Sequence, residues 1–349
     1  MYLIIYICAM SEKMAPLMAL TGLTLKEIAD NMEKCGIGKE YASRVAIGIY
    51  RKRVRDISSM TSIAGTVRKR LSDYFVTGIS EPAKRVLSSD GSVKYLFGFP
   101  GEREVETVFI PETKRNTLCL SAQCGCGRAC LYCRTGEMGF RGNLTAGEIL
   151  NQVLAIPESE SVNRIVFMGM GEPLDNLSAV IKAIEILTAE WGLATGHSNI
   201  TVSTVGILPA VKEFLSATRC NLTLSLISPI SEERIKMVPA ERIYPAAEIV
   251  RLMKEASLSK RRRFTIAYMM LEDINDSERH LRELINLIRG SAIRVNLLTY
   301  HSHGDMSFRP SGRERMEQFR NGLLAAGISA SVRKSRGEDI AAACGMLIR

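Results

Sequence analysis

The chain has 349 residues, of which 46% are apolar and 24% are charged. This length and composition place it among well-packed globular proteins that can build a main catalytic domain and a small accessory one. The 46 Lys and Arg against 37 Asp and Glu give a net charge of +9. That balance suits a polyanionic partner but does not establish one.

The nine cysteines are an odd number, and most lie in one short stretch of the chain. They are Cys8, Cys35, Cys119, Cys124, Cys126, Cys130, Cys133, Cys220 and Cys344. A disulfide framework would space its cysteines differently. The pattern therefore predicts a reducing, cytoplasmic setting in which thiols bind metal or take part in catalysis.

The segment MYLIIYICAM (1–10) is apolar but carries no basic region and no small-residue cleavage site. It is also much shorter than a membrane span. We expect no membrane association, and translation starting at Met10 or Met14 fits the sequence as well.

Basic residues form four clusters along the chain. They are RKRVR (51–55), VRKR (67–70), KRRR (260–263) and SVRKSR (331–336). Each cluster alone is typical of a solvated helix face, whereas four on a basic chain favour RNA or DNA as a partner. Aromatic residues are scarce among them, so no stacking platform for single strands is visible.

Residues 1–75 predict a small helical domain. In TLKEIADNMEKCG (24–36), Thr24 can cap a helix, Glu27 completes a capping box, and Gly36 ends the helix. Residues 76–115 predict a β-rich linker, in which Asp90-Gly91 marks a tight turn between alternating segments.

Residues 116–349 alternate apolar strands with helices. The predicted strands are TLCLSA (117–122), RIVFMGM (164–170), ITVSTVG (200–206), LTLSLIS (222–228), FTIAYMML (264–271) and IRVNLLTY (293–300). The helices between them include AGEILNQVLAI (146–156), LSAVIKAIEILTAEWG (177–192) and ERHLRELINLIRG (278–290). The alternation predicts a parallel sheet, either an open barrel or a doubly wound sheet, with its chemistry at the carboxyl ends of the strands.

The loop after the first of these strands carries Cys126, Cys130 and Cys133 in a C-x3-C-x2-C pattern. Three thiolates on one loop can hold three irons of a [4Fe–4S] cluster and leave the fourth iron open to a ligand. A structural zinc site that also recruits Cys124 is the alternative. Zinc sites usually pair two cysteine knuckles farther apart, so this spacing favours the cluster.

The same motif resembles that of the radical S-adenosylmethionine (SAM) superfamily, and the sequence around it resembles the RlmN/Cfr family of ribosomal RNA adenine methyltransferases. The matching stretches are VETVFIPE (105–112), TLCLSAQCGCGRACLYCRTGEMGF (117–140), FMGMGEPLDN (167–176), TVSTVGILPA (201–210) and VRKSRGEDIAAACGML (332–347). The resemblance implies a partial (β/α)6 TIM-like barrel, with an RNA-binding role for residues 1–75. It also implies a [4Fe–4S] cluster and SAM as cofactors.

The resemblance further implies which residues contact the cofactors. The cluster ligands are Cys126, Cys130 and Cys133, and the SAM contacts are Gly171, Glu172, Ser203, Ser225, Leu226, Ile227 and His301. On its own, a Gly-Glu-Pro turn is ordinary loop chemistry, and serines in apolar strands equally fit satisfied core hydroxyls.

The same resemblance implies that Cys344 accepts a methyl group from one SAM molecule. A second SAM molecule yields the radical that removes a hydrogen atom from this methyl group. The methylene group then joins the adenine ring, Cys119 releases the product by forming a disulfide, and Glu106 accepts the ring proton. Without the resemblance, each of the two cysteines would more often be a small buried side chain in the core. Glu106 would likewise be interpreted as an exposed carboxylate on a strand.

This chain departs from the family pattern at three positions near the expected chamber. It has Ile227 in place of His, His301 in place of Asn, and Ala267 in place of Glu. Such changes are compatible with the same reaction on another RNA target.

The resulting hypothesis is a monomeric RNA methyltransferase that modifies adenine C2 in large-subunit ribosomal RNA and in transfer RNA, with flavodoxin or ferredoxin as electron donor. Methylation at C8 is one alternative. The others are a radical enzyme acting on a protein or small molecule with a merely structural Cys344, and a non-catalytic RNA-binding protein with zinc.

Overall fold

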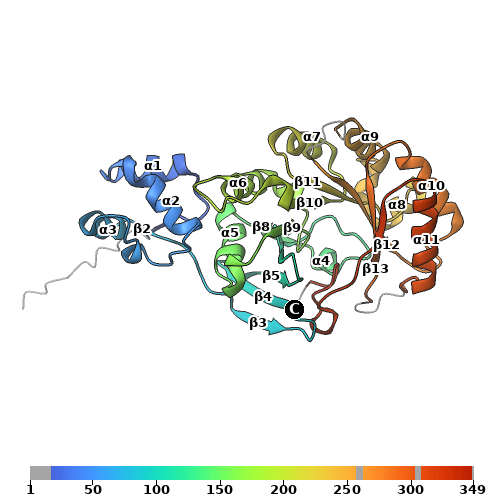
Figure 1. Ribbon diagram of the computed structural model, residues 1–349, viewed down its shortest axis with the longest axis horizontal. Helices are drawn as coiled ribbons and strands as arrows, with labels where there is room; N and C mark the ends of the chain where they lie inside the picture. Colours follow the sequence, from blue (N-terminus) through green and yellow to red (C-terminus); the bar gives the residue numbers. More distant parts are fainter. Residues whose placement is uncertain (1–16, 257–261, 303–307, 348–349) are drawn as a thin grey trace, which may run out of the picture.

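The computed structural model describes residues 17–256, 262–302 and 308–347, and its centre is a ten-stranded sheet (Figure 1). The strand order is β14-β13-β12-β11-β10-β9-β6-β5-β4-β3. These strands are β3 (Lys84–Leu87), β4 (Val93–Phe99), β5 (Arg103–Ile110), β6 (Thr117–Leu120), β9 (Arg164–Phe167), β10 (Ile200–Thr204), β11 (Asn221–Ser225), β12 (Phe264–Met270), β13 (Arg294–Thr299) and β14 (Ala330–Val332).

From β6 to β14 the strands are parallel and follow one another along the sheet without a reversal. A doubly wound sheet would reverse its strand order. Of the two predicted architectures, the fold is therefore the open barrel. All six predicted strands are confirmed. The seventh parallel strand, β14, was not predicted because its three residues are too few to show an alternating pattern.

The helices that connect the parallel strands lie outside the barrel, as right-handed crossovers require (Figure 1). They are α5 (Ala146–Leu154), α6 (Leu177–Thr188), α7 (Leu208–Ala217), α8 (Ser231–Met237), α9 (Ala246–Ala256), α10 (Glu278–Ile288) and α11 (Arg313–Ala325). Single 3-10 turns join several elements, namely η3 (Pro157–Glu160), η4 (Pro173–Asn176), η5 (His197–Asn199), η6 (Pro239–Arg242) and η7 (Glu338–Ile340).

Strands β3, β4 and β5 form antiparallel pairs, and β5 also pairs with β6. The predicted turn at Asp90-Gly91 joins β3 to β4, with Gly91 in a left-handed conformation at φ +85°. The segment predicted as a β-rich linker therefore continues the barrel sheet at its edge.

A small ribbon of β7 (Gln123–Gly125) and β8 (Phe140–Asn143) closes the cysteine loop, which also contains α4 (Arg134–Glu137). Gly125 has φ +69°, and a Cβ there would lie 1.8 Å from the carbonyl oxygen of Gly139. Only glycine fits this close approach. The ribbon was not predicted, because three- and four-residue strands give no clear periodicity.

The N-terminal region contains α1 (Leu25–Lys34), α2 (Ala42–Tyr50) and α3 (Gly65–Ser72), with 3-10 turns η1 (Lys39–Tyr41) and η2 (Ile57–Ser59). The predicted capping box is confirmed, because Thr24 and Glu27 exchange hydrogen bonds at the start of α1. A short parallel pair, β1 (Met18–Ala19) and β2 (Phe75–Val76), joins the two ends of this region. Met10, Met14 and Cys8 lie outside the described residues.

The basic segment RKRVR contributes to the contact between this helical region and the barrel. Arg53 donates to the Ser159 hydroxyl at 2.7 Å, and Arg51 donates to the Glu190 carbonyl at 3.2 Å. The ring of Tyr50 packs against Trp191 at 5.9 Å between centroids. These two arginines thus hold the accessory region in place, a role that neither the solvated-face nor the RNA interpretation of the cluster included.

Within the described residues, no helix combines the length and the apolar character required to cross a bilayer.

Candidate active site

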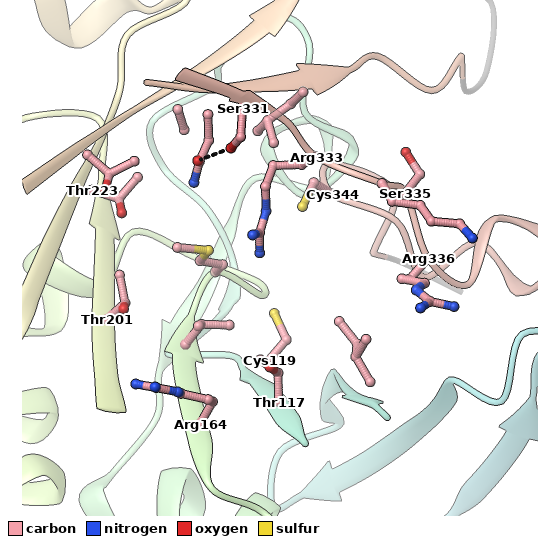
Figure 2. Close-up of a pocket in the computed structure, with 18 of the residues that line it drawn as sticks. Thr117, Cys119, Arg164, Thr201, Thr223, Ser331, Arg333, Ser335, Arg336 and Cys344 are labelled. Carbon is pink, nitrogen blue, oxygen red and sulfur yellow. Dashed lines mark hydrogen bonds between the residues drawn. The ribbon is translucent and has the colours of Figure 1, made fainter. Parts of the chain in front are cut away.

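A cavity of about 500 Å³ occupies the barrel interior. Its walls are the inward side chains of the parallel strands, and the C-terminal tail after β14 covers one side. Figure 2 shows the sulfur atoms of Cys119 on β6 and Cys344 on the tail projecting into this space. Two thiols separated by most of the catalytic domain in sequence therefore open into one chamber.

The cysteine loop lies at the carboxyl end of β6, where the barrel architecture places its chemistry. Cys126 and Cys130 are buried, and Cys133 is partly buried. Burial raises the pKa of Cys126 to about 11, and burial together with the charges of the other two thiols raises the pKa of Cys130 further. Without a bound cation, the deprotonated forms of three neighbouring thiols are therefore unfavourable. An iron cluster stabilises them, because its positive iron ions bind the thiolates.

A single metal ion fits this loop poorly. Among the described residues, no group of three or more His, Cys, Asp or Glu side chains is arranged to hold one ion. A [4Fe–4S] cluster holds each thiolate on a different iron, so its ligands do not have to converge on one point. The donor set fits the cluster rather than zinc.

The turn after β9 contains Gly171 and Glu172. Gly171 has φ +92°, and a Cβ there would lie 2.4 Å from the Cβ of Gln123. The amide of Glu172 donates to the Gln123 side-chain oxygen at 2.9 Å. Glycine thus allows this turn to pack directly on β7, next to the cysteine loop.

The Glu172 carboxylate is buried between β9 and β10. Its oxygens accept hydrogen bonds from the amides of Leu174 at 3.0 Å and Val205 at 2.9 Å. Burial raises its pKa to about 7, and the two amides oppose that increase. The Thr204 hydroxyl is a further hydrogen-bond partner of the carboxylate. A carboxylate offers four lone-pair sites, so one is left to accept from a cationic donor.

Ser203 and Ser225 lie on neighbouring strands with their hydroxyl oxygens 3.3 Å apart. Each follows a cavity-lining threonine by two residues, Thr201 on β10 and Thr223 on β11. Because strand side chains alternate, both serines face the cavity side, nearer the carboxyl ends. This arrangement satisfies both hydroxyls and also presents them toward the chamber.

Leu226 and Ile227 follow β11. Leu226 is fully buried, and its amide donates to the Ala267 carbonyl at 3.0 Å. Ile227 has φ +64°, an uncommon conformation for a β-branched residue. Its carbonyl accepts a hydrogen bond from the Asn275 side chain at 2.7 Å, which helps to hold the backbone there.

Arg234 on α8 is a residue of this site that the sequence analysis missed. It is fully buried, pairs with Glu241, and donates to the carbonyls of Leu226 at 2.8 Å and Val205 at 2.7 Å. It therefore joins the ends of β10 and β11. In the sequence, Arg234 lies among residues of both charges in a helix, and nothing there indicates that it is buried or joins the strand ends.

His301 follows β13 and lines the cavity. Its Nε2 atom lies 2.7 Å from the Ser335 hydroxyl, and burial lowers its pKa. The histidine that replaces Asn thus connects the last barrel loop to the C-terminal tail. Ala267, which replaces Glu, also lines the cavity and leaves that position without a carboxylate.

The tail that carries Cys344 is fixed to the cysteine loop. The amide of Arg134 donates to the Gly345 carbonyl at 3.0 Å, and the Thr135 hydroxyl donates to the Leu347 carbonyl at 2.9 Å. Both donors belong to α4, directly after Cys133. Cys344 therefore lies on the same side of the sheet as the cysteine triad.

The two cavity thiols differ in their surroundings. Burial and the charge of Cys344 raise the pKa of Cys119 to about 12. Desolvation also raises the pKa of Cys344, but the nearby Arg333 guanidinium opposes that increase. Figure 2 shows Arg333 extending into the cavity beside Cys344. In the sequence, Arg333 shows no sign of this position beyond its place in the basic cluster 331–336.

Glu106 on β5 is 5% exposed, so its interpretation as an exposed strand carboxylate is wrong. It does not line the cavity wall itself, but Val108, two residues along the same face, does. Its Oε1 atom pairs with the Lys94 ammonium at 2.9 Å.

Comparison with known proteins agrees with this geometry. The model of the radical SAM superfamily matches residues 120–285. A relative from Parabacteroides distasonis, named probable dual-specificity RNA methyltransferase RlmN, is 44% identical over 328 residues, which cover 94% of this chain and 96% of the relative. The RlmN protein of Syntrophotalea carbinolica is 37% identical over 331 residues, which cover 94% of this chain and 89% of that protein.

A solved structure of a radical SAM methyltransferase from Sphaerobacter thermophilus is 35% identical to the chain. It superposes with a TM-score of 0.89 and covers 95% of this chain and 99% of that one. These matches overturn the non-catalytic zinc-protein alternative and confirm a [4Fe–4S] cluster and SAM as cofactors. With the superfamily model, the relatives and the fold in agreement, the chain belongs to the RlmN family of radical SAM RNA methyltransferases.

Proposed function

We propose that this enzyme methylates adenine C2 in large-subunit ribosomal RNA and in transfer RNA, using Cys344 as the methyl carrier. The observation that carries the proposal is the shared chamber. Cys119 and Cys344 open into one cavity, and the Cys344 tail is bonded to α4 beside Cys133. A structural cysteine would not require a second thiol facing it.

Cys126, Cys130 and Cys133 would hold the cluster, and Glu172, Ser203 and Ser225 would contact SAM near it. When bound, these cofactors would supply one-electron chemistry: an acceptor for a hydrogen atom of the methyl group on Cys344, and an acceptor for the electron released when the base regains aromaticity.

The residues of the chain supply the polar steps. The Cys344 thiolate forms a bond to the SAM methyl carbon, and the sulfonium bond breaks with its electron pair remaining on the departing sulfur. Arg333 favours that thiolate. Once the carbon has joined the ring, Glu106 accepts the ring proton while the C–H electron pair stays with the ring.

Cys119 then separates the enzyme from its product. Its thiolate attacks the Cys344 sulfur, a disulfide forms, and the bond between that sulfur and the methylene carbon breaks. The electron pair leaves on carbon, which takes a proton to become the methyl group. A cellular thiol reductant must then reduce the disulfide, which suits a reducing cytoplasm.

Charge around the cavity supports an RNA substrate. Arg164, Arg263 and Arg294 stand at the amino ends of their strands and all line the cavity. The Arg263 and Arg294 side chains have no hydrogen-bond or ion-pair partner in the described part of the chain. Guanidinium groups free of protein partners can contact phosphates while a base enters the chamber.

An anaerobic assay with reconstituted enzyme, SAM, reduced flavodoxin and unmodified RNA tests the proposal. We expect 2-methyladenosine in digested RNA by mass spectrometry and one methyl group on the peptide that contains Cys344. Cys344→Ala should abolish both products. Cys35→Ala, in the accessory region, is the matched control and should retain them.

RNA methylation that continues in Cys344→Ala would contradict the carrier role. A product that co-elutes with 8-methyladenosine would show that the enzyme methylates C8 and not C2.

A further inference from the structure

Lys94 and Glu106 form a buried ion pair at the edge of the chamber. The ammonium of Lys94 lies 2.9 Å from Oε1 of Glu106, and the side chains are only 11% and 6% exposed. The second oxygen, Oε2, is buried and has no hydrogen-bond partner among the described residues. Buried carboxylate oxygens usually have a partner, so this oxygen lacks one that a group bound in the chamber could supply.

The strand register explains why these side chains face Cys119. Lys94 pairs with Val108, and Val108 pairs with Cys119, so these three residues form one row across β4, β5 and β6. Glu106 lies two residues from Val108 on the same face of β5. Diagonal neighbours on a sheet face are about 7–8 Å apart, which places the carboxylate beside the resolving thiol.

Lys94 also contacts the tail that carries Cys344. Its ammonium donates to the Ala341 carbonyl at 3.4 Å. The β3–β4 turn holds the same tail, because Asp339 accepts from the Ser88 hydroxyl at 2.6 Å and Asp90 accepts from the Gly337 amide at 3.0 Å. One cation thus bonds to both the carboxylate and the segment leading to the methyl carrier.

We propose that Lys94 is a positioning residue for proton removal. It fixes Oε1 of Glu106 so that Oε2 is the oxygen that accepts the ring proton, and its bond to the Ala341 carbonyl connects this pair to the tail. This inference rests on the proposed function, in which Glu106 accepts that proton. In this step the C–H bond breaks, its electron pair stays in the ring, and an O–H bond forms on Oε2.

The test separates proton removal from the earlier methylation of Cys344, which does not need Glu106. In Lys94→Met we expect methylation of the Cys344 peptide to stay within about twofold of the parent enzyme, while methylation of RNA falls about tenfold to a hundredfold, the scale of a misplaced general base. RNA deuterated at adenine C2 should then show a kinetic isotope effect larger than the parent shows, because proton removal has become slow.

Two further variants sharpen the result. Lys94→Arg keeps a cation and should recover part of the lost rate. Lys94→Met added to Glu106→Gln should slow RNA methylation no further, because a residue acting through Glu106 has no effect once that carboxylate is gone. The neutral double variant also leaves no buried charge unpaired. Lys84→Met on the exposed β3 is the matched control and should behave as the parent.

Three results would overturn the inference: full RNA methylation by Lys94→Met, a rate loss without an enlarged isotope effect, or parallel loss of Cys344 methylation. The last would make Lys94 a tail anchor only. Failure of the proposed function is a separate result, since the parent enzyme itself would then lack methylated Cys344.

Discussion

The two chamber cysteines show how the environment gives two side chains of one kind different properties. Cys344 is exposed and has Arg333 beside it, whereas Cys119 is partly buried and its pKa is raised to about 12. A thiol with a pKa that high is almost entirely protonated near neutral pH. Under the proposed function, this protonated thiol would react only slowly with other partners before the covalent adduct forms.

This difference predicts a pH dependence for product release. Below the pKa of Cys119, the thiolate fraction rises with pH, so decay of the protein–RNA adduct should accelerate about tenfold per pH unit between about pH 7 and pH 9. Single-turnover decay of the adduct on denaturing gels measures this rate. Cys119→Ala should accumulate the adduct at every pH, and a decay rate that ignores pH would contradict the assignment.

At the scale of elements, the loops after β10 and β11 depend on one buried cation. Arg234 donates to the carbonyls of Val205, Ser225 and Leu226, and its charge is balanced by Glu241. Glu241 in turn accepts a hydrogen bond at 2.9 Å from the amide of Ala246, the first residue of α9. The ion pair thus connects two strand ends with a helix that covers them.

Arg234→Met should destabilise the enzyme strongly, because it leaves Glu241 buried without its counter-ion. The expected loss is about 3–5 kcal/mol in the free energy of unfolding. Urea unfolding of cluster-loaded protein under anaerobic conditions measures it. Arg251→Met, on the exposed side of α9, serves as the control and should unfold at the parent's urea midpoint. A small loss in Arg234→Met would mean that the loops do not need this anchor.

At the scale of the whole molecule, two groups of basic residues have different surroundings. Arg51 and Arg53 bond to the barrel and hold the accessory helices, whereas Arg263 and Arg294 face the cavity without partners in the described ranges. Of these two groups, the second is the one free to meet a polyanion. Net charge alone does not distinguish a basic patch that binds RNA from one that joins two parts of a protein.

RNA binding should therefore weaken with salt, and the slope should depend on the cavity arginines. Each phosphate contact contributes about 0.7–0.9 to the slope of log K against log salt concentration. We expect Arg263→Ala and Arg294→Ala each to reduce the slope by roughly that amount in filter-binding titrations. Arg251→Ala should leave it unchanged. Equal slopes for all these proteins would exclude the arginines from the RNA contact.

Local patterns in the sequence determined much of this enzyme. The alternation of apolar strands and helices predicted six of the parallel strands, the capping box at Thr24 predicted α1, and the spacing of Cys126, Cys130 and Cys133 predicted the cluster loop. Resemblance to the family predicted the cofactors, which the comparisons confirm, and the roles of Cys119, Cys344 and Glu106, which remain predictions.

The tertiary structure alone decided how distant segments meet. The choice of an open barrel, the docking of the tail on α4, and the contact of Lys94 with Ala341 all join residues far apart in the chain. Periodicity and motif spacing report on neighbouring residues, whereas these contacts follow from strand order, register and packing across the whole sheet.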